Sequence, residues 1–527
     1  MACVIALSAC TKAGSGGAIG GRHAWTRPGV LRVAVQSDFK NLNPLLNSNT
    51  TDVFVDRLMF EPLVSADPKG DPVPILVTTV PTQENKGISP DGLTITYHLR
   101  HDVKWTDGVA VTSRDVKWSW QAIVNGDNNV VSRHGYDIIS TIDTPDPYTA
   151  VVHLKQKFAP FVDTFFAESD QPYMIAPAHV LAGYPNINQI PFNSAPTVSD
   201  GPFKFVQWAH GDHVRLDRNE NFFLGKPHLS QVYIHIVPDE DTAVSLLRTH
   251  GIDYIFQASI ENYPTIENVP DVHIVWVNVN GYSYLQFNCS SPSLKDPKVR
   301  LALSYAINKS QMIRENTFGT QTIATEDIPN WMWAFNPQVR QLPFDPEKAR
   351  TLLAAAGYGP NNPLRIVMVT NNSNATRRRE SVEVQAMLRR VGVDMEIKYY
   401  PGDMLFAPAG MGGILQLGKF DMTDSGWYAG VDPDDSTQFT CKNFPPGGYN
   451  YFRYCDPEME RLQHQALTSY DRPTRKAAYD AIQVLLARDN PGIFTYWMRQ
   501  MEPVSVDFQG FDPNPVVESW DAWQWSI

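Results

Sequence analysis

Short apolar segments bounded by turn-forming residues recur along most of the chain. They are rich in β-branched and aromatic residues, which predicts β-strands. The predicted strands are 31–35, 93–99, 150–154, 232–237, 272–279, 364–370 and 393–399. Segments with well-marked helix starts alternate with them. This mixed order indicates an α/β fold.

Three helix starts share an Asp-Pro pair, in which aspartate can cap free amides and proline is tolerated at the first helical position. The pairs begin at Asp296, Asp345 and Asp456, before predicted helices 299–307, 349–356 and 459–467. Gly357 is typical of a left-handed helix end. Thr112 and Asp115 predict a further capped start, before a helix at 116–123.

Composition narrows the class of protein. A length of 527 residues corresponds to several domain-sized units. The 44 Lys and Arg residues against 56 Asp and Glu give a net charge of −12, which disfavours nucleic-acid binding. Charged residues make up 19% and aromatic residues 11%, so the chain is expected to be well packed rather than disordered. It contains no apolar run long enough for a membrane-spanning helix.

Familiar catalytic and metal-binding motifs are absent from the sequence. The cysteines and histidines lack zinc spacing, so neither a metal nor a cofactor is predicted. The acidic run 432–435 is interpreted as a turn with helix-capping carboxylates, or as one carboxylate facing a ligand. The basic run 377–379 is interpreted as a solvated helix start, or as a site for an anion. These features favour a binding protein over an enzyme.

Cys441 and Cys455 stand 14 residues apart around a Pro-Pro-Gly-Gly turn. If the protein is exported, we expect them to form a disulfide. Two unpaired thiols are the alternative.

The N-terminal segment, Leu7-Ser8-Ala9-Cys10, resembles a bacterial lipobox, in which the cysteine carries a lipid. A small, Gly-rich stretch follows from Thr11 to Gly21 and suits a flexible tether. The positive region of a signal peptide is missing and the apolar stretch is short. We therefore interpret residues 1–29 as a truncated lipoprotein signal and tether, with Cys10 as the lipidation site.

One segment carries a long family motif. It runs from Tyr97 through Leu99-Arg100, Trp105, Asp107-Gly108 and Thr112 to Asp115-Val116. It resembles a signature of the extracytoplasmic solute-binding proteins of peptide-type ABC importers, the dipeptide/oligopeptide/nickel-binding family 5. Further similar segments follow in the family's order at 31–44, 57–63, 201–205, 218–219, 296–309, 346–358 and 420–434.

The resemblance implies an α/β, two-lobed, type II periplasmic-binding-protein clamshell with an extra subdomain inserted in the first lobe. Lobe I would comprise 30–58, 198–284 and 497–527. The inserted subdomain would be 59–197, and lobe II would be 285–496. A ligand would lie between lobes that close by a hinge motion.

The resemblance also implies ligand-binding residues. They are Trp427, which matches a pocket tryptophan, Tyr284 and Tyr496 at the lobe crossings, Tyr428, and the loop Ser48, Asn49 and Thr50, whose backbone can pair with an extended peptide. Peptide binders usually carry an ammonium-binding aspartate three residues after the tryptophan. That position is Gly430 here, so either Asp432 takes this role or the ammonium anchor is absent.

The implied function is a non-enzymatic receptor of an ABC import system. It would capture a peptide or similar small solute and deliver it to a membrane permease and its ATPase. We expect a monomer, held in the periplasm or at the cell surface by a lipid anchor. The alternatives are a sensor or chaperone-like module on the same scaffold, or a hydrolase.

Overall fold

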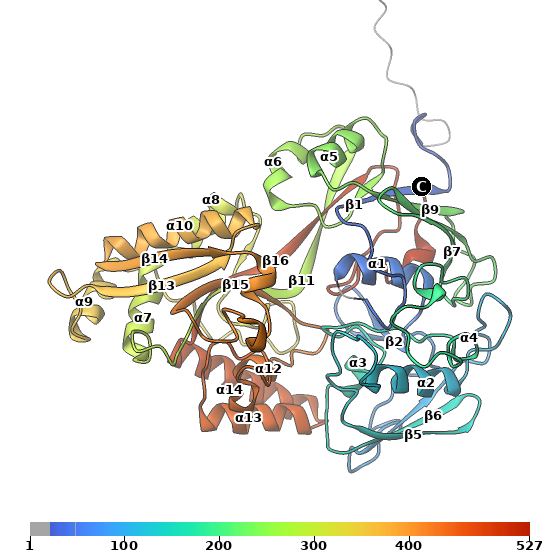
Figure 1. Ribbon diagram of the computed structural model, residues 1–527, viewed down its shortest axis with the longest axis horizontal. Helices are drawn as coiled ribbons and strands as arrows, with labels where there is room; N and C mark the ends of the chain where they lie inside the picture. Colours follow the sequence, from blue (N-terminus) through green and yellow to red (C-terminus); the bar gives the residue numbers. More distant parts are fainter. Residues whose placement is uncertain (1–21, 48) are drawn as a thin grey trace, which may run out of the picture.

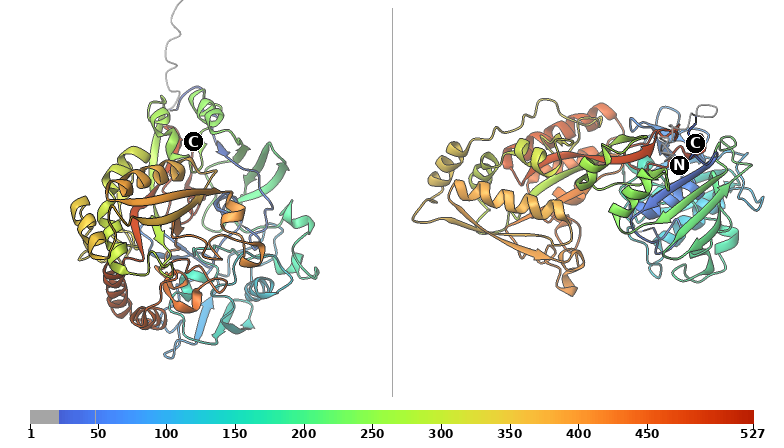
Figure 2. Two further views of the ribbon diagram at one scale, coloured as in Figure 1. Left: turned by 60° about the vertical axis from the view of Figure 1, so that its left-hand side comes forward. Right: turned by 90° about the horizontal axis from the view of Figure 1, so that it is seen from above.

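The structure is a computed structural model, and it describes residues 22–47 and 49–527. Two halves lie side by side and are joined by a pair of long strands (Figure 1). The view from above shows how narrow this junction is compared with either half (Figure 2). Cys10 and Ser48 lie outside the described residues.

A large mixed sheet runs through both halves in the order β14-β13-β15-β11-β16-β10-β1-β9-β8-β7, with β12 paired to β16. Its first-half strands are β1 (Val30–Val35), β7 (Phe203–Ala209), β8 (His213–Arg218), β9 (Gln231–Ile236) and β10 (Tyr254–Ile255). The second half holds β12 (Thr322–Ile323), β13 (Leu364–Asn371), β14 (Val393–Tyr400) and β15 (Met422–Tyr428).

The strands β11 (Val272–Phe287) and β16 (Gly492–Ser505) pair antiparallel and pass from one half to the other. The register of the pair shifts between Asn278 and Tyr282 and again between Ser283 and Tyr284. The expected lobe limits at 284/285 and 496/497 therefore fall inside two continuous strands. Sequence analysis predicted only the first half of β11, up to Val279.

Helices cover the second half on both sides and give it two large cores, beside a smaller cluster around Leu405, Leu415 and Phe420. One core packs the strands against α7 (Pro297–Ala306), α8 (Lys309–Asn316), α9 (Pro346–Ala355) and α10 (Ala375–Arg390). The other lies under the antiparallel pair α13 (Pro457–Thr468) and α14 (Arg472–Asp489). The second half also contains the short helices α11 (Gly402–Leu405) and α12 (Ser436–Phe439). The predicted Asp-Pro helix starts are confirmed, because Asp296, Asp345 and Asp456 each accept a backbone amide bond.

The first half has one extensive apolar core and a smaller one around Ala243, Leu247 and Ile266. It contains α1 (Thr50–Met59), α5 (Glu240–Arg248) and α6 (Tyr263–Ile266), and the C-terminal tail returns to it beside β1 (Figure 1). A subdomain carries β2 (Val64–Ala66), β3 (Pro72–Pro74), β4 (Thr94–His98), β5 (Ile139–Asp146) and β6 (Thr149–Leu154). It also holds α2 (Ser113–Val124), α3 (Phe161–Thr164) and α4 (Ala178–Leu181).

This α/β, two-lobed architecture with a subdomain beside the first lobe agrees with the predicted fold class. The sulfurs of Cys441 and Cys455 are bonded, and Cys289 is a free, partly buried thiol. Within residues 22–47 and 49–527 no helix is long and apolar enough to cross a membrane.

Candidate functional site: the interlobe cleft

Two adjoining cavities lie between the halves at the level of the crossing strands. The larger has a volume of about 560 Å³ and the smaller, more enclosed one about 200 Å³. They share Gln257, Val279, Tyr428 and Gln500 on their walls, so they form one continuous cleft. Its size lies within the roughly 300–1,000 Å³ of small-molecule sites.

The start of α1 forms one wall of the smaller cavity, with Asn49 and Thr50. Asn49 caps the helix, its side chain accepting a bond from the Asp52 amide at 2.9 Å. The Thr50 hydroxyl donates to Gln257 Oε1 at 2.9 Å. Capping therefore fixes these residues at the edge of the cleft, where Thr50 is the first residue of α1 rather than part of a loop.

Gln257 occupies the centre of the first-lobe wall. Its backbone has a φ of 48°, a left-handed value that is uncommon for a residue with a side chain. The Gln257 amide donates to Glu502 at 2.9 Å, and its side chain donates to Glu518 Oε1 at 2.8 Å. These bonds hold the side chain against the cleft, and backbone strain of this kind clusters at functional sites.

Strand β15 supplies the second-lobe wall through Tyr428, which is 57% exposed and lines both cavities. Side chains alternate along a strand, so the neighbouring Trp427 faces away from Tyr428. Trp427 packs against Tyr449 with the ring centroids 5.7 Å apart, and it lines neither cavity.

The two crossing-strand tyrosines differ in their surroundings. Tyr496 lines the larger cavity, and its hydroxyl donates to Glu380 at 3.1 Å. Tyr284 is only 3% exposed and stacks on Phe452 in the core of the second half. Burial raises the pKa of both phenols, so they stay neutral over the physiological range.

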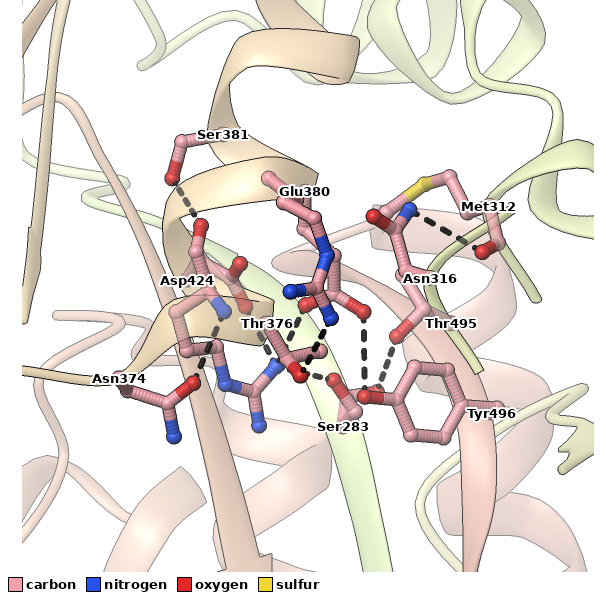
Figure 3. A network of polar contacts seen from close by, with 12 residues as sticks. Ser283, Met312, Asn316, Asn374, Thr376, Glu380, Ser381, Asp424, Thr495 and Tyr496 are labelled. Carbon is pink, nitrogen blue, oxygen red and sulfur yellow. Dashed lines mark hydrogen bonds and ion pairs between the residues drawn. The ribbon is translucent and has the colours of Figure 1, made fainter. Parts of the chain in front are cut away.

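Arg377 lines the larger cavity and belongs to a buried polar network. Its guanidinium donates to Asp424 at 2.6 Å, to Glu380 at 3.2 Å and to Ser283. Burial opposes its charge, but Asp424 and Glu380 raise the pKa of Arg377. Figure 3 shows Glu380, Asp424, Ser283 and Tyr496 as parts of one network of polar contacts. The charge of Arg377 is therefore balanced by carboxylates of this chain. Arg377 is neither a solvated residue nor a free site for an anion.

Asp432 lies in the loop after β15, in a separate small pocket with a volume of about 30 Å³. Both of its carboxylate oxygens accept bonds from Arg475 Nη2, at 2.8 and 2.7 Å. Burial raises the pKa of Asp432, while Arg475 acts in the opposite direction. Within the described chain, this carboxylate therefore has an internal cationic partner.

Sequence analysis missed Glu240 and Glu261 of the larger cavity, and three further charged residues of the cleft. Arg499 lines the larger cavity with its guanidinium 5.2 Å from the Trp276 ring centroid. Asp170 and Glu518 line the smaller cavity. Of the three, only Arg499 had a signal, because it follows the expected lobe crossing directly. No described group of His, Cys, Asp and Glu residues has the geometry to hold a metal ion.

Comparisons with known proteins agree with this architecture. The oligopeptide-binding protein AppA of Bacillus subtilis is 23% identical over 100% of this chain and 97% of its own length. The glutathione-binding protein GsiB of Pectobacterium atrosepticum is 27% identical, covering 92% of this chain and 91% of its own. The structure of NikZ from Campylobacter jejuni, in complex with Ni(L-His), aligns with a TM-score of 0.79 at 24% identity, covering 95% of this chain and 100% of NikZ.

The sequence model described as "Bacterial extracellular solute-binding proteins, family 5 Middle" matches residues 71–449, well over half of the chain. The predicted family, fold and receptor role are thereby confirmed. The chain belongs to the family 5 bacterial extracellular solute-binding proteins, the ligand-binding receptors of ABC import systems.

Proposed function

We propose that this receptor binds a short peptide or peptide-like solute in the interlobe cleft. The observation that carries the proposal is the lining of the joined cavities. The amide side chains of Gln257, Gln500 and Asn49 can pair with a peptide backbone. Arg499 forms no ion pair with any residue in 22–47 or 49–527, so its charge is available to a ligand. A free carboxylate is the matching group.

The contributions of the residues follow from their positions. Tyr428 and Tyr496 are proposed to contact the ligand directly, as are Asn49, Thr50 and the neighbouring Ser48. Trp427 and Tyr284 are proposed to support this wall from behind, and Asp432 to support the adjoining loop through Arg475. Residues 30–58, 198–284 and 497–527 would move as lobe I with the inserted 59–197, and 285–496 as lobe II.

The relatives support the ligand class through their names alone, which refer to oligopeptides and glutathione. We propose further that the receptor is a monomer, leaves its ligand chemically unchanged and presents it to a permease coupled to an ATPase. Lipid on Cys10 would hold it outside the cytoplasm. Labelling with a palmitate analogue, compared between the unmodified chain and Cys10→Ala, tests the anchor.

Binding is tested by thermal shift and calorimetry on the chain without residues 1–21. The ligands are di- to pentapeptides, glutathione and a nickel–histidine chelate. A peptide at a hundredfold excess over Kd should stabilise the folded receptor by about 2.7 kcal/mol. Peptide recovered intact after incubation would support a receptor rather than a hydrolase.

Arg499→Gln should weaken binding of a free-carboxylate peptide but not that of its C-terminal amide. Arg365→Gln is the matched control, because the Arg365 side chain is 76% exposed and lies outside the cleft lining. Stabilisation by the chelate alone, with no response to any peptide, would refute the proposed ligand class.

A further inference from the structure

The smaller cavity combines an apolar wall with two carboxylates. The apolar residues that line it are Val53, Pro172, Val279, Pro515 and Val516. Asp170 comes from the inserted subdomain and Glu518 from the C-terminal tail. No lysine, arginine or histidine is among the described residues that line this cavity.

Glu518 is the deeper of the two carboxylates. Its side chain is 5% exposed, and one oxygen accepts the bond from Gln257 at 2.8 Å. Burial raises the pKa of Glu518 to about 7. Across the described chain it forms no ion pair with a basic side chain. Because a buried carboxylate without a cation is costly, a cationic ligand group would be strongly favoured here.

Asp170 reaches the same cavity through a close approach of the two lobes. The Val431 amide of the second lobe donates to the Glu168 carbonyl of the first at 3.1 Å. A Cβ atom on Gly430 would lie 2.6 Å from Ser169 Cα and 2.9 Å from the Asp170 nitrogen. A side chain at position 430 would therefore push the segment that carries Asp170 away from Tyr428.

Asp170 is an exposed residue that lines this cavity and also the small pocket beside it, and it has no lysine or arginine ion partner among the described residues. Burial raises the pKa of Asp170 and the charge of His134 acts in the opposite direction, but His134 forms its ion pair with Asp434, at 3.6 Å. His134 is therefore already paired. The smaller cavity keeps two carboxylates that no described basic residue balances by direct contact.

We propose that the smaller cavity is a specificity pocket for a basic side chain, a lysine- or arginine-type cation on an aliphatic stem, with Glu518 and Asp170 as its carboxylate partners. The stem would lie along the valine and proline wall, and the charged head would meet the carboxylates, as long basic side chains do at apolar surfaces. The inference rests on the proposed peptide-type ligand and adds the residue class that the receptor prefers.

The test uses pairs of tripeptides that differ only in lysine against norleucine, measured by calorimetry at pH 7.5. Norleucine keeps the stem and lacks the charge. We expect the lysine peptide to bind roughly thirty-fold or more tightly, as for a buried charge pair that loses one partner. N-terminal acetylation should leave this preference intact, because the pocket takes the side chain rather than the α-ammonium.

Variants test which residues cause the preference for the lysine peptide. Glu518→Gln should remove most of the preference, and Gly430→Ala should reduce it by holding Asp170 back. Glu347→Gln is the matched control, since Glu347 lies on α9 with its side chain 86% exposed. The lysine peptide should also bind more tightly as the pH rises from 6 to 8, because Glu518 then ionises, whereas burial and the Glu518 charge hold the pKa of the neighbouring Glu502 well above its usual value.

Equal affinities for the lysine and norleucine peptides would overturn the inference while leaving the proposed function intact. A preference that disappears on N-acetylation would overturn it as well, since the cation would then be the α-ammonium. If no peptide binds at all, the proposed function fails, and the inference fails with it. The peptide comparison needs no variant and stays decisive even if Gly430→Ala does not fold.

Discussion

Removing the charge of Asp432 should destabilise the second lobe rather than abolish ligand binding. The Asp432 and Arg475 side chains are 7% and 9% exposed, and both carboxylate oxygens accept from the same guanidinium nitrogen. In Asp432→Asn, Arg475 stays buried on α14 without this partner. Arg475 still donates a hydrogen bond to the Ala466 carbonyl at 2.9 Å, and its guanidinium still lies 5.3 Å from the Trp333 ring centroid.

Removing one partner of a buried ion pair typically lowers the free energy of unfolding by about 3–5 kcal/mol. Asp163 moderates the loss. Burial first, and the Asp432 charge second, raise the pKa of Asp163 to about 7. Without that charge Asp163 ionises more readily and can partly balance Arg475. We therefore expect the free energy of unfolding to fall by an amount near the lower end of this range, about 3 kcal/mol.

The assay is differential scanning calorimetry of the unliganded chain. A cooperative unit of roughly 200 residues has an unfolding entropy of about 0.4 kcal/mol/K, so 3 kcal/mol lowers its midpoint by about 7 °C. Asp394→Asn serves as control, because the Asp394 side chain is 68% exposed and 3.7 Å from Arg365. That variant should change the midpoint little.

Two outcomes decide the role of Asp432. Replacing both partners by apolar residues, Asp432→Leu with Arg475→Met, should recover most of the lost stability, because no unpaired charge remains. An unchanged midpoint in Asp432→Asn, together with lost peptide binding, would refute the structural role. Asp432 would then be the ammonium anchor that one interpretation of the sequence suggested.

Three further predictions concern stability. Replacing Cys441 and Cys455 by serine should cost about 3 kcal/mol in urea unfolding, as the chain-entropy model gives for a loop of this length; equal stability with and without reductant would contradict it. Gly201→Ala should cost about 1–3 kcal/mol, because its Cβ would lie 2.4 Å from the carbonyl carbon of Met59; an unchanged unfolding midpoint would show that the backbone yields. Burial raises the pKa of Glu168 to about 7, so its contribution to stability is complete below the ordinary value near 4.5 and is lost as pH rises through 7. The thermal midpoint should fall between pH 5.5 and 8, with a smaller fall in Glu168→Gln; identical pH profiles for the two chains would exclude this group.

Local elements were predictable because their signals are local. The capping aspartates of α7, α9 and α13 accept backbone bonds from residues two or three positions along the chain. Thr112 and Asp115 likewise form the expected capping box at the start of α2. Such bonds depend on a few neighbouring residues, so the sequence contains the information that determines them.

The position of aromatic side chains was not predictable in the same way. Trp427 and Tyr428 are adjacent, equally aromatic and on one strand, yet only Tyr428 lines the cleft. Which of them faces the cleft depends on the pairing of β15 with β11, in which Trp427 stands opposite Tyr282. A pairing shift of one residue would exchange their faces.

The sequence by itself determined the family, the α/β class and the helix starts, because these follow from motifs and local hydrogen bonds. Only the tertiary structure assembled the cleft. Asp170 lies far along the chain from Arg499 and Glu518, yet all three line the two joined cavities, which form where β11 and β16 connect the lobes. The tertiary structure also pairs the charges of Asp432 and Arg377 with opposite charges inside the protein. Arg499 has no ion partner among the described residues. Charge balance is a property of three-dimensional neighbours, and residue order does not specify those neighbours.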